Sequence, residues 1–311
     1  MKVLFVSSGN AKDGISPIVR NQGQSLEEQG VEIDFFTIRG KGLWSYLRHI
    51  FILRKYLKGN HYDIIHAHYS FCSYVASLSG ARPLIVSLMG SDVISRKYPR
   101  IIMSFFYNYF WSKTIVKSLE MYQKLGFKEI EIIPNGVDTE RFDTSDKRNC
   151  QAVLGWDKEK THILFASDPD RLEKNFTLFQ RAISLIINDH EIIFHSLKNI
   201  PQKDIPDYIN AADALVLTSL HEGSPNTIKE AMSCNCPIVS TNVGDVKWVI
   251  GNTDGCFIAS YEPEDVAEKI KLAIEYRKKH GRTNGRERII ELGLDSKTIA
   301  ETIIELYKTV L

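Results

Sequence analysis

Short apolar runs alternate with longer amphipathic stretches from one end of the 311-residue chain to the other. Such alternation is typical of strands buried between helices, so it predicts an α/β fold with parallel sheets. Candidate strands in the first half of the chain lie at residues 3–7, 32–37, 64–67, 84–88, 113–116 and 130–133. Candidate strands in the second half lie at residues 162–166, 191–194, 214–217, 237–241 and 255–258.

A polar interruption divides this pattern into two halves. Residues 138–156 are polar and charged and have no clear apolar period, so we place a domain boundary near residue 150. The length is sufficient for two domains, which we expect at 1–150 and 151–295. Residues 296–311 are strongly periodic in Ile, Leu and Tyr, which predicts a final helix. We expect this helix to pack back toward the first domain, where its apolar stripe would be covered.

The composition excludes several classes of protein. A hydrophobic content of 43% and a charged content of 25% are those of a soluble globular chain. The net charge of +1 gives no reason to expect a nucleic-acid partner. The five cysteines show no CxxC pair, which favours a reducing compartment without structural zinc. No run approaches the ~18 apolar residues of a membrane-spanning helix, and we expect a cytoplasmic protein.

The segment SLHEGSPNTIKEAM, residues 219–232, holds two carboxylates, Glu222 and Glu230, with seven residues between them. Ser224 is predicted to be the N-cap of a helix, with Pro225 at its first position. Free backbone N–H groups at a helix start favour a phosphate. One acid beside such an anion site and a second acid inside the helix would suit a nucleotide sugar. Read alone, the pair also suits the general acid and base of a glycoside hydrolase.

Two cations follow the first strand of the second half, Arg171 and Lys174. Ligands of doubly wound folds bind beyond the carboxyl ends of strands. Arg171 with its planar fork and Lys174 as a point charge could therefore neutralise a diphosphate. The alternative is a pair of solvated loop cations.

The first half offers a second group of candidates. Gly14 lies in the loop after the opening strand, which ends in a Ser-Pro helix start but carries no GxGxxG fingerprint. His66 and His68 should point the same way by strand alternation, and either could be an ordinary half-buried histidine. Asp92 follows another strand end, in Met-Gly-Ser-Asp, and puts a carboxylate in the same expected cleft.

Two stretches, residues 43–58 and 96–113, are basic and rich in aromatic residues. One interpretation is amphipathic helices with an apolar core side and a solvated basic side. The other is a surface where Trp, Tyr and Phe lie among anionic headgroups. Both stretches fall in the first domain, which would place any contact with an anionic membrane there.

Together these residues resemble the family 4 retaining glycosyltransferases, in which two Rossmann-like domains face each other across a cleft (the GT-B fold). The resemblance spans nearly the whole chain. Four motifs carry it: the Glu-x7-Glu box from Glu222 to Glu230, the phrase IPNGVD at 133–138 followed by Arg141, the signature MGSD at 89–92, and the phosphate pair Arg171 and Lys174.

The resemblance implies roles for residues of the second domain. Glu230 would hold the ribose hydroxyls of the nucleotide, and Glu222 would face the donor sugar. Arg171 and Lys174 would stabilise charge on the leaving diphosphate without a metal. The loop backbone would touch sugar and phosphate at four residues: Gly223, Ser224, Pro225 and Asn226.

Roles in the first domain follow from the same resemblance. His68 would approach the donor sugar from the opposite domain as a catalytic residue, and Gly14 would lie near the phosphates. Asn135 would contribute to donor binding, and Asp92 would lie on the acceptor side.

The implied activity is transfer of a hexose or N-acetylhexosamine from a UDP- or GDP-sugar to a glycan or lipid-linked acceptor, with retention at the anomeric carbon. Such enzymes act in bacterial surface polysaccharide synthesis, need no metal or other cofactor, and can be peripheral on the inner face of the cell membrane. The likeness leaves two alternatives open. One is a nucleotide-sugar epimerase of the same fold, and the other is a non-catalytic sugar-nucleotide-binding subunit.

Three departures from the family pattern affect these expectations. The paired glycines of the first loop are replaced by Asp13 and Gly14. The glycine before the proline of a later strand is replaced within Cys-Asn-Cys-Pro, residues 234–237. The glycine-rich turn expected after residues 191–194 reads His-Ser-Leu-Lys-Asn, which leaves the choice between UDP and GDP open.

Overall fold

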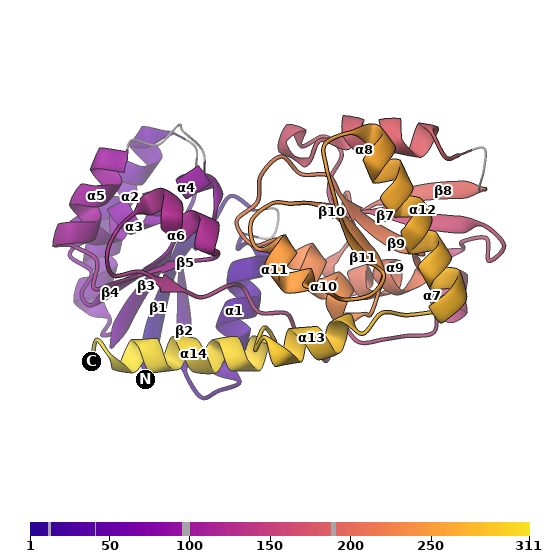
Figure 1. Ribbon diagram of the computed structural model, residues 1–311. Helices are drawn as coiled ribbons and strands as arrows, with labels where there is room; N and C mark the ends of the chain where they lie inside the picture. The colour runs from indigo at the N-terminus through magenta and orange to yellow at the C-terminus, as the bar shows by residue number, and fades with distance from the viewer. Residues whose placement is uncertain (12–13, 41, 95–99, 188–190) are drawn as a thin grey trace. The chain divides into compact units, whose positions relative to one another are not determined.

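The computed structural model describes residues 1–11, 14–40, 42–94, 100–187 and 191–311 (Figure 1). The chain forms two compact units, one of Met1–Gly136 with Ser296–Leu311 and one of Val137–Asp295. The expected boundary near residue 150 falls inside helix α7 (Lys147–Leu154). The polar stretch before it is folded onto the second unit by hydrogen bonds and by the buried ring of Phe142. Asn210, for example, accepts from the Ser145 N–H at 2.9 Å and donates to the Asp143 carbonyl at 3.0 Å.

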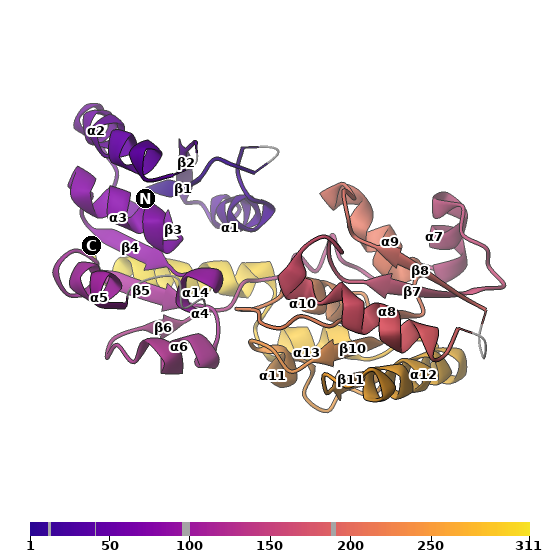
Figure 2. The same cartoon turned by 90° about the horizontal axis from the view of Figure 1, so that it is seen from above.

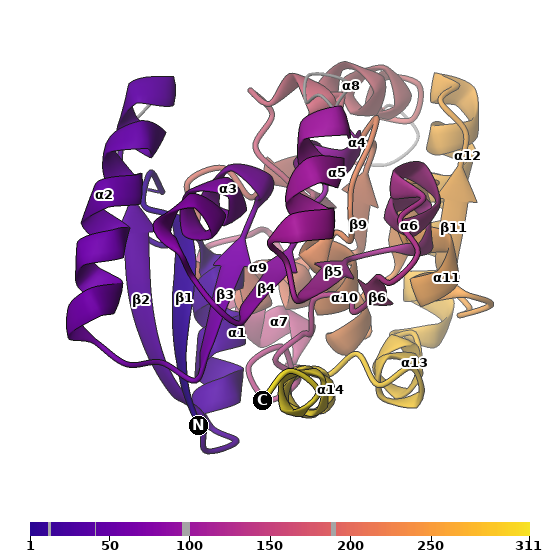
Figure 3. The same cartoon turned by 90° about the vertical axis from the view of Figure 1, so that its left-hand side faces the viewer.

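The first unit contains a parallel six-stranded sheet in the order β2-β1-β3-β4-β5-β6 (Figure 3). Its strands are β1 (Lys2–Ser8), β2 (Glu32–Ile38), β3 (Ile64–His68), β4 (Leu84–Ser87), β5 (Lys113–Val116) and β6 (Glu131–Ile132). The chain builds outward from β1 to β2 and then reverses to continue from β3. The order therefore changes direction between β1 and β3.

Helices cover both faces of this sheet. They are α1 (Pro17–Glu27), α2 (Leu43–Gly59), α3 (Ser70–Ser79), α4 (Ser91–Ile94), α5 (Arg100–Tyr109), α6 (Leu119–Leu125) and α14 (Ser296–Lys308). Figure 2 shows α2, α3 and α5 on one side of the sheet and α1 with α14 on the other.

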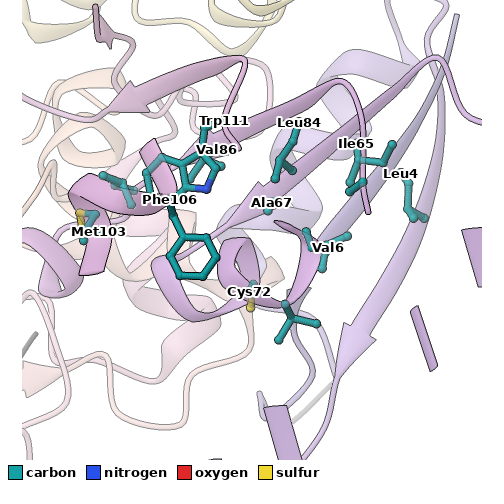
Figure 4. Packing of buried hydrophobic residues seen from close by; sticks show 14 of the residues in the cluster. Leu4, Val6, Ile65, Ala67, Cys72, Leu84, Val86, Met103, Phe106 and Trp111 are labelled. Atoms are coloured by element: carbon teal, nitrogen blue, oxygen red, sulfur yellow. The ribbon is translucent and has the colours of Figure 1, made fainter. Parts of the chain in front are cut away.

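Alternate residues of the central strands build the core under α3 and α5 (Figure 4). Because side chains alternate across a strand, every second residue of β1, β3 and β4 points into this cluster. The strand contributions are Leu4, Val6, Ile65, Ala67, Leu84 and Val86, and the helices add Cys72, Met103 and Phe106. The strands are buried on both faces, which explains their continuous apolar runs.

The C-terminal helix α14 completes the first unit by packing beside α1. Tyr307 of α14 is fully buried, and its hydroxyl lies 2.6 Å from Nδ1 of His66 in β3. The other nitrogen of that ring lies 2.9 Å from Oγ of Ser87 in β4. The helix thus supplies a polar partner for a histidine that is buried in the middle of the sheet.

The second unit contains a parallel five-stranded sheet in the order β11-β10-β9-β7-β8. Its strands are β7 (Thr161–Phe165), β8 (Ile192–Ser196), β9 (Ala214–Leu217), β10 (Ile238–Thr241) and β11 (Cys256–Ala259). The order reverses between β7 and β9. Each of the eleven predicted strands has a counterpart in the two sheets, within two residues at either end. The α/β prediction with two Rossmann-like units is confirmed.

Helices also cover both faces of the second sheet. They are α7, α8 (Phe176–Ser184), α9 (Ile205–Ala211), α10 (Asn226–Ser233), α11 (Val246–Ile250), α12 (Pro263–His280) and α13 (Gly285–Glu291), with short 3-10 helices at Leu172–Lys174 and Gln202–Asp204. A cluster of apolar residues from β7, α8 and α12 forms the core on one face. The two ends of the unit lie together, because the N–H of Val137 donates to the carbonyl of Leu294 at 2.9 Å. Among the described residues, no helix is both long enough and apolar enough to cross a bilayer.

We expect Tyr307→Phe to lower the free energy of unfolding by about 1–3 kcal/mol, since it leaves a buried histidine nitrogen without its partner. Chemical denaturation, followed by tryptophan fluorescence, measures this loss of stability. Tyr109→Phe is the matched control, because Tyr109 is exposed. Equal stabilities of the two variants would show that the bond to His66 contributes nothing.

Candidate functional site

Two loops leave the second sheet at its point of reversal, after β7 and after β9. Doubly wound sheets bind ligands at this position, outside the carboxyl ends of the strands. Lys174 from the first loop forms an ion pair with Oε1 of Glu222 from the second, and the two side chains are only 10% and 15% exposed. The hydroxyl of Ser219 donates to the same oxygen at 2.7 Å. The fold therefore brings together two of the residues that the sequence singled out.

Hydrogen bonds to backbone carbonyls hold these two loops together. Thr218 at the end of β9 donates its hydroxyl to the carbonyls of Lys174 at 3.1 Å and Asn175 at 3.0 Å. The N–H of Leu220 donates to the carbonyl of Glu173 at 2.9 Å. Asn175 has a left-handed backbone, with φ of +50°, which ends the short 3-10 helix and starts α8. The position of Lys174 is thus fixed by its own backbone as well as by its ion pair.

Arg171 belongs to the same loop but has a different environment. Its guanidinium is 56% exposed, and its Nε donates to Oε1 of Glu173 at 2.8 Å. The structure therefore places Arg171 at the rim of the loop and Lys174 inside it.

The start of α10 differs from the prediction. The helix begins at Asn226 with Pro225 as its N-cap, and no side chain caps it, so the prediction of a Ser224 N-cap is wrong. The Ser224 hydroxyl donates to Oδ2 of Asp245 at 2.6 Å and accepts from Nζ of Lys229. Hydrogen bonds to charged groups are stronger than those to a neutral N–H, so the buried charges take the serine away from the helix end.

Lys229 and Asp245 form a buried ion pair behind the loop, with 3.4 Å between Nζ and Oδ2. Burial lowers the pKa of Lys229, and Asp245 opposes that shift. The second oxygen of Asp245 is buried and has no hydrogen-bond partner in the described part of the chain. Sequence reasoning placed the turn that holds Asp245 at the same edge but missed Lys229 and the pairing of the two.

The turn after β10 supports the loop that carries Glu222. Gly244 has φ of +57°, and a Cβ added there would lie 2.7 Å from the carbonyl oxygen of Gly223 and 3.0 Å from that of Glu222. Only glycine permits this close approach. Thr241 adds a hydrogen bond of 2.7 Å to the carbonyl of Ser219. The neighbouring strands β7, β9 and β10 thus position one loop.

Glu230 lies on the buried side of α10. Among the described residues its carboxylate accepts no hydrogen bond from another side chain or from the backbone. Burial raises the pKa of Glu230 to about 7, while Arg141 and Lys229 oppose the shift. Glu222 is ion-paired and Glu230 is not, so the two glutamates of the box have different environments.

His68 ends β3, at the reversal point of the first sheet. It is buried, its Nε2 lies 2.8 Å from Oε1 of Gln22, and its ring stacks on His66 at 4.3 Å. Its Nδ1 is buried and has no hydrogen-bond partner within the described ranges. Burial lowers the pKa of His68 to about 3, with a further contribution from Lys117. The imidazole is therefore neutral at physiological pH.

Asp92 is buried, and both of its oxygens bind backbone groups. Oδ1 accepts the N–H groups of Met89 and Gly90, and Oδ2 accepts that of Ser70, each at 3.0 Å. Burial raises the pKa of Asp92 to about 6, and these backbone hydrogen bonds oppose the shift. The carboxylate ties the loop after β4 to the loop after β3.

The remaining predicted residues of the first unit lie in loops and at a helix start. Gly14 has φ of +82°, and its N–H donates to the Ala11 carbonyl at 2.9 Å. Ser16 caps α1 as predicted, accepting the Val19 N–H at 3.4 Å. Asn135 is half-buried in the last residues before the second unit. Asp13 lies outside the described residues.

An aromatic stack occupies the region where the glycine-rich turn was expected. The ring of His195, in β8, lies 3.6 Å from that of Trp156 and nearly parallel to it. Its Nε2 lies 2.9 Å from Nδ1 of His162. Burial lowers the pKa of His195 to about 4, and His162 adds to the effect. The sequence showed the missing glycines but not this stack.

Two curated relatives resemble the chain at the level of sequence. TuaC of Bacillus subtilis (strain 168), named as a candidate teichuronic acid biosynthesis glycosyltransferase, is 26% identical, and the match covers 67% of this chain and 60% of TuaC. The UDP-Gal:alpha-D-GlcNAc-diphosphoundecaprenol alpha-1,3-galactosyltransferase of Escherichia coli is 24% identical, over 68% of this chain and 66% of that protein. The chain thus spans less than two thirds of the length of either relative.

Solved structures share the fold over nearly the full length. Sucrose-phosphate synthase from Thermosynechococcus elongatus superposes with a TM-score of 0.76 at 16% identity, covering 99% of this chain and 98% of that one. HepE of Anabaena, solved with UDP and glucose, gives a TM-score of 0.75 at 19% identity, covering 99% of both chains. The TM-scores and the coverage establish a common GT-B fold.

Models of two protein families match successive parts of the chain. The model described as Glycosyltransferase Family 4 matches residues 12–141, and the model described as Glycosyl transferases group 1 matches residues 155–291. The second range contains the Lys174–Glu222 pair and Glu230, and the first contains His68 and Asp92. The chain belongs to the family 4 glycosyltransferases.

Proposed function

We propose that the chain is a retaining glycosyltransferase that moves a sugar from a UDP- or GDP-sugar to a glycan or lipid-linked acceptor in bacterial surface polysaccharide synthesis. The observation that carries this proposal is the buried Lys174–Glu222 pair at the reversal point of the second sheet, with Glu230 on the adjoining helix outside every ion pair among the described residues. The E. coli relative is named for a UDP-sugar donor and a lipid-diphosphate acceptor, which supports the same substrate classes here.

The proposed roles follow from the environment of each side chain. Lys174 is desolvated and already oriented, so it would stabilise charge on the leaving diphosphate without reorganising. Arg171 would add a second, solvated cation at the rim. Glu230 would accept the ribose hydroxyls, and Glu222 would face the donor sugar. We propose no metal or other cofactor for this reaction.

In the first unit, we propose His68 and Gly14 as contributors to the donor side, because His68 ends β3 and Gly14 lies in the loop after β1, the two strands at the reversal point of that sheet. A neutral His68 could donate or accept a hydrogen bond but would not carry charge. Asn135 remains a proposed donor contact. Asp92 would shape the acceptor side indirectly, through the two loops that it joins.

A panel of UDP- and GDP-sugars, with and without a lipid-linked saccharide acceptor, tests the proposal. We expect slow release of nucleotide from one donor alone and faster release with acceptor. The product should keep the anomeric configuration of the donor, as NMR would show. Interconversion of sugars without nucleotide release would identify an epimerase, and binding without either reaction would identify a non-catalytic subunit.

Glu230→Gln is the control for the donor site in the same assay. Since the pKa of Glu230 is about 7 in the free protein, its carboxylic acid loses its proton as the pH rises from 6 to 8. A carboxylate accepts hydroxyl protons better than its acid form does, so donor binding should strengthen over this range. The glutamine variant should bind more weakly and show no such pH dependence.

We expect Lys174→Met to lower kcat by about 100- to 1,000-fold, as loss of a buried electrostatic contact to a transition state does. Arg171→Met should cost about tenfold or less, because an exposed cation interacts weakly through solvent. Steady-state kinetics with the preferred donor measure both variants.

Lys174→Met also removes the cation that pairs with Glu222, and the carboxylate left behind destabilises the fold. The double variant Lys174→Met/Glu222→Gln removes both charges and should restore stability without restoring activity. Equal losses of kcat in the two methionine variants would contradict the separate roles of Lys174 and Arg171.

We further propose that the outer face of α2 contacts an anionic membrane surface. Trp44 is 84% exposed and Phe51 is 70% exposed, and Arg48 and Lys55 follow each of them by four residues on the same face. No acidic residue occurs in α2, and Leu53 is its one buried residue. Interfaces of this composition suit headgroups. Arg96 and Lys97 of the second basic stretch lie outside the described residues.

Co-sedimentation with phosphatidylglycerol vesicles at low salt tests the membrane contact. Lys55→Gln/Lys58→Gln should weaken binding about 30-fold, from about 1 kcal/mol per cation, and Trp44→Ser/Phe51→Ser should weaken it at least as much through lost burial. Lys158→Gln/Lys279→Gln removes two exposed cations elsewhere and should bind normally. Binding that is unchanged in both α2 variants would contradict the proposal.

A further inference from the structure

A cavity of about 410 Å³ lies in the second unit between the start of α7 and the end of α12. Asp213, which lines it, immediately precedes β9. The cavity therefore lies at the amino-terminal edge of the sheet, whereas the loops with Lys174 and Glu222 leave the carboxyl edge. Its volume is within the range of about 300–1,000 Å³ that is usual for small-molecule sites.

The lining of this cavity carries an excess of positive charge. Four cations, Lys147, Arg277, Lys278 and Arg282, line it together with two acids, Asp146 and Asp213. Asp213 forms an ion pair with Lys147, with 2.5 Å between Oδ1 and Nζ. Asp146 caps α7 by accepting the Asn149 N–H at 2.9 Å. In the part of the chain that the structure describes, no carboxylate forms an ion pair with either arginine or with Lys278.

The two arginines are held together by neutral groups. Arg277 is buried and donates to the carbonyl of Asn210 at 3.3 Å, and Arg282 donates to the side-chain oxygen of the same residue at 3.0 Å. Arg282 also donates to the carbonyl of Cys234 at 2.7 Å. Burial lowers the pKa of Arg282, and the like charge of Arg277 lowers it further. Their fixed positions thus maintain an electrostatic repulsion that a bound anion would offset.

We propose that this cavity binds a small phosphate-bearing anion, at a site separate from the nucleotide-sugar site. Guanidinium groups match the geometry of a phosphate and bind it with paired hydrogen bonds. Arg277 lies below the surface, so a compact soluble ion reaches it more readily than a flat membrane does. Lys278 is exposed at the mouth of the cavity and completes the cationic lining. The proposal does not depend on the transferase activity.

A thermal-shift titration with sodium phosphate, against sodium chloride at equal ionic strength, tests the site. Because a ligand that binds only the folded protein raises its stability, phosphate should raise Tm in the wild type. Lys278→Gln should weaken the apparent phosphate affinity about three- to tenfold, the effect of losing one charged contact at a partly exposed site. Lys279→Gln is the matched control, because Lys279 is the exposed neighbour that does not line the cavity.

A second arm separates this site from the donor site. The same titration in saturating UDP, and in Lys174→Met, should give the wild-type phosphate shift, since neither change touches the cavity. Loss of the shift in either condition would place the phosphate at the donor loops and overturn the proposal. It would also be overturned by a shift no larger than that of chloride, or by equal affinities in the Lys278 and Lys279 variants.

Discussion

A buried ion pair between Lys174 and Glu222 is the interaction on which the rest of the second unit's site depends. It joins the loops that follow two adjacent strands, β7 and β9, at the reversal of the sheet, and neither charge could stay buried without the other. The neighbouring hydrogen bonds serve the same end, since Thr218 fixes the backbone of Lys174 and Ser219 binds the carboxylate of Glu222. The site is rigid because its charges require partners. This rigidity is what a preorganised electrostatic role demands.

Buried polar groups, more than apolar contacts, shape the loops at the edges of both sheets. In the second unit, Lys229 and Asp245 hold Ser224 away from the helix end, and the turn at Gly244 packs on the carbonyl of Gly223. In the first unit, Asp92 binds three backbone N–H groups from two loops. Each arrangement removes a charge from water and replaces the lost hydration with fixed hydrogen bonds. The loops thereby gain single conformations that short, glycine-containing segments would otherwise lack.

The sequence predicted the central strands well because a strand buried on both faces must be apolar throughout, and that signal is local. The Ser16 cap was equally local and was confirmed. Ser224 had the same signature but met Asp245, 21 residues along the chain, and pairings at such separations leave no periodic pattern. The same reason explains why Lys229 and the stack of His195 on Trp156 were missed. The boundary near residue 150 was misplaced because the polar stretch after Val137 is held to the second unit by distant hydrogen bonds and by one buried ring, Phe142, which leave no periodic pattern. The membership of Lys174 and Glu222 in one site was predictable, since parallel strands bring their carboxyl ends to one edge.

The path of the chain through the two units bears on how the protein forms during synthesis. The second unit is inserted into the first, with its two ends joined at Val137 and Leu294. It can therefore close its own core as soon as Asp295 has left the ribosome. The first unit, although made earlier, must wait for Tyr307 to cover His66. Domains usually fold in the order in which they emerge. Here the first unit is synthesised earlier but completed later. Until α14 is in place, His66 in its sheet has no Tyr307 hydroxyl as a partner.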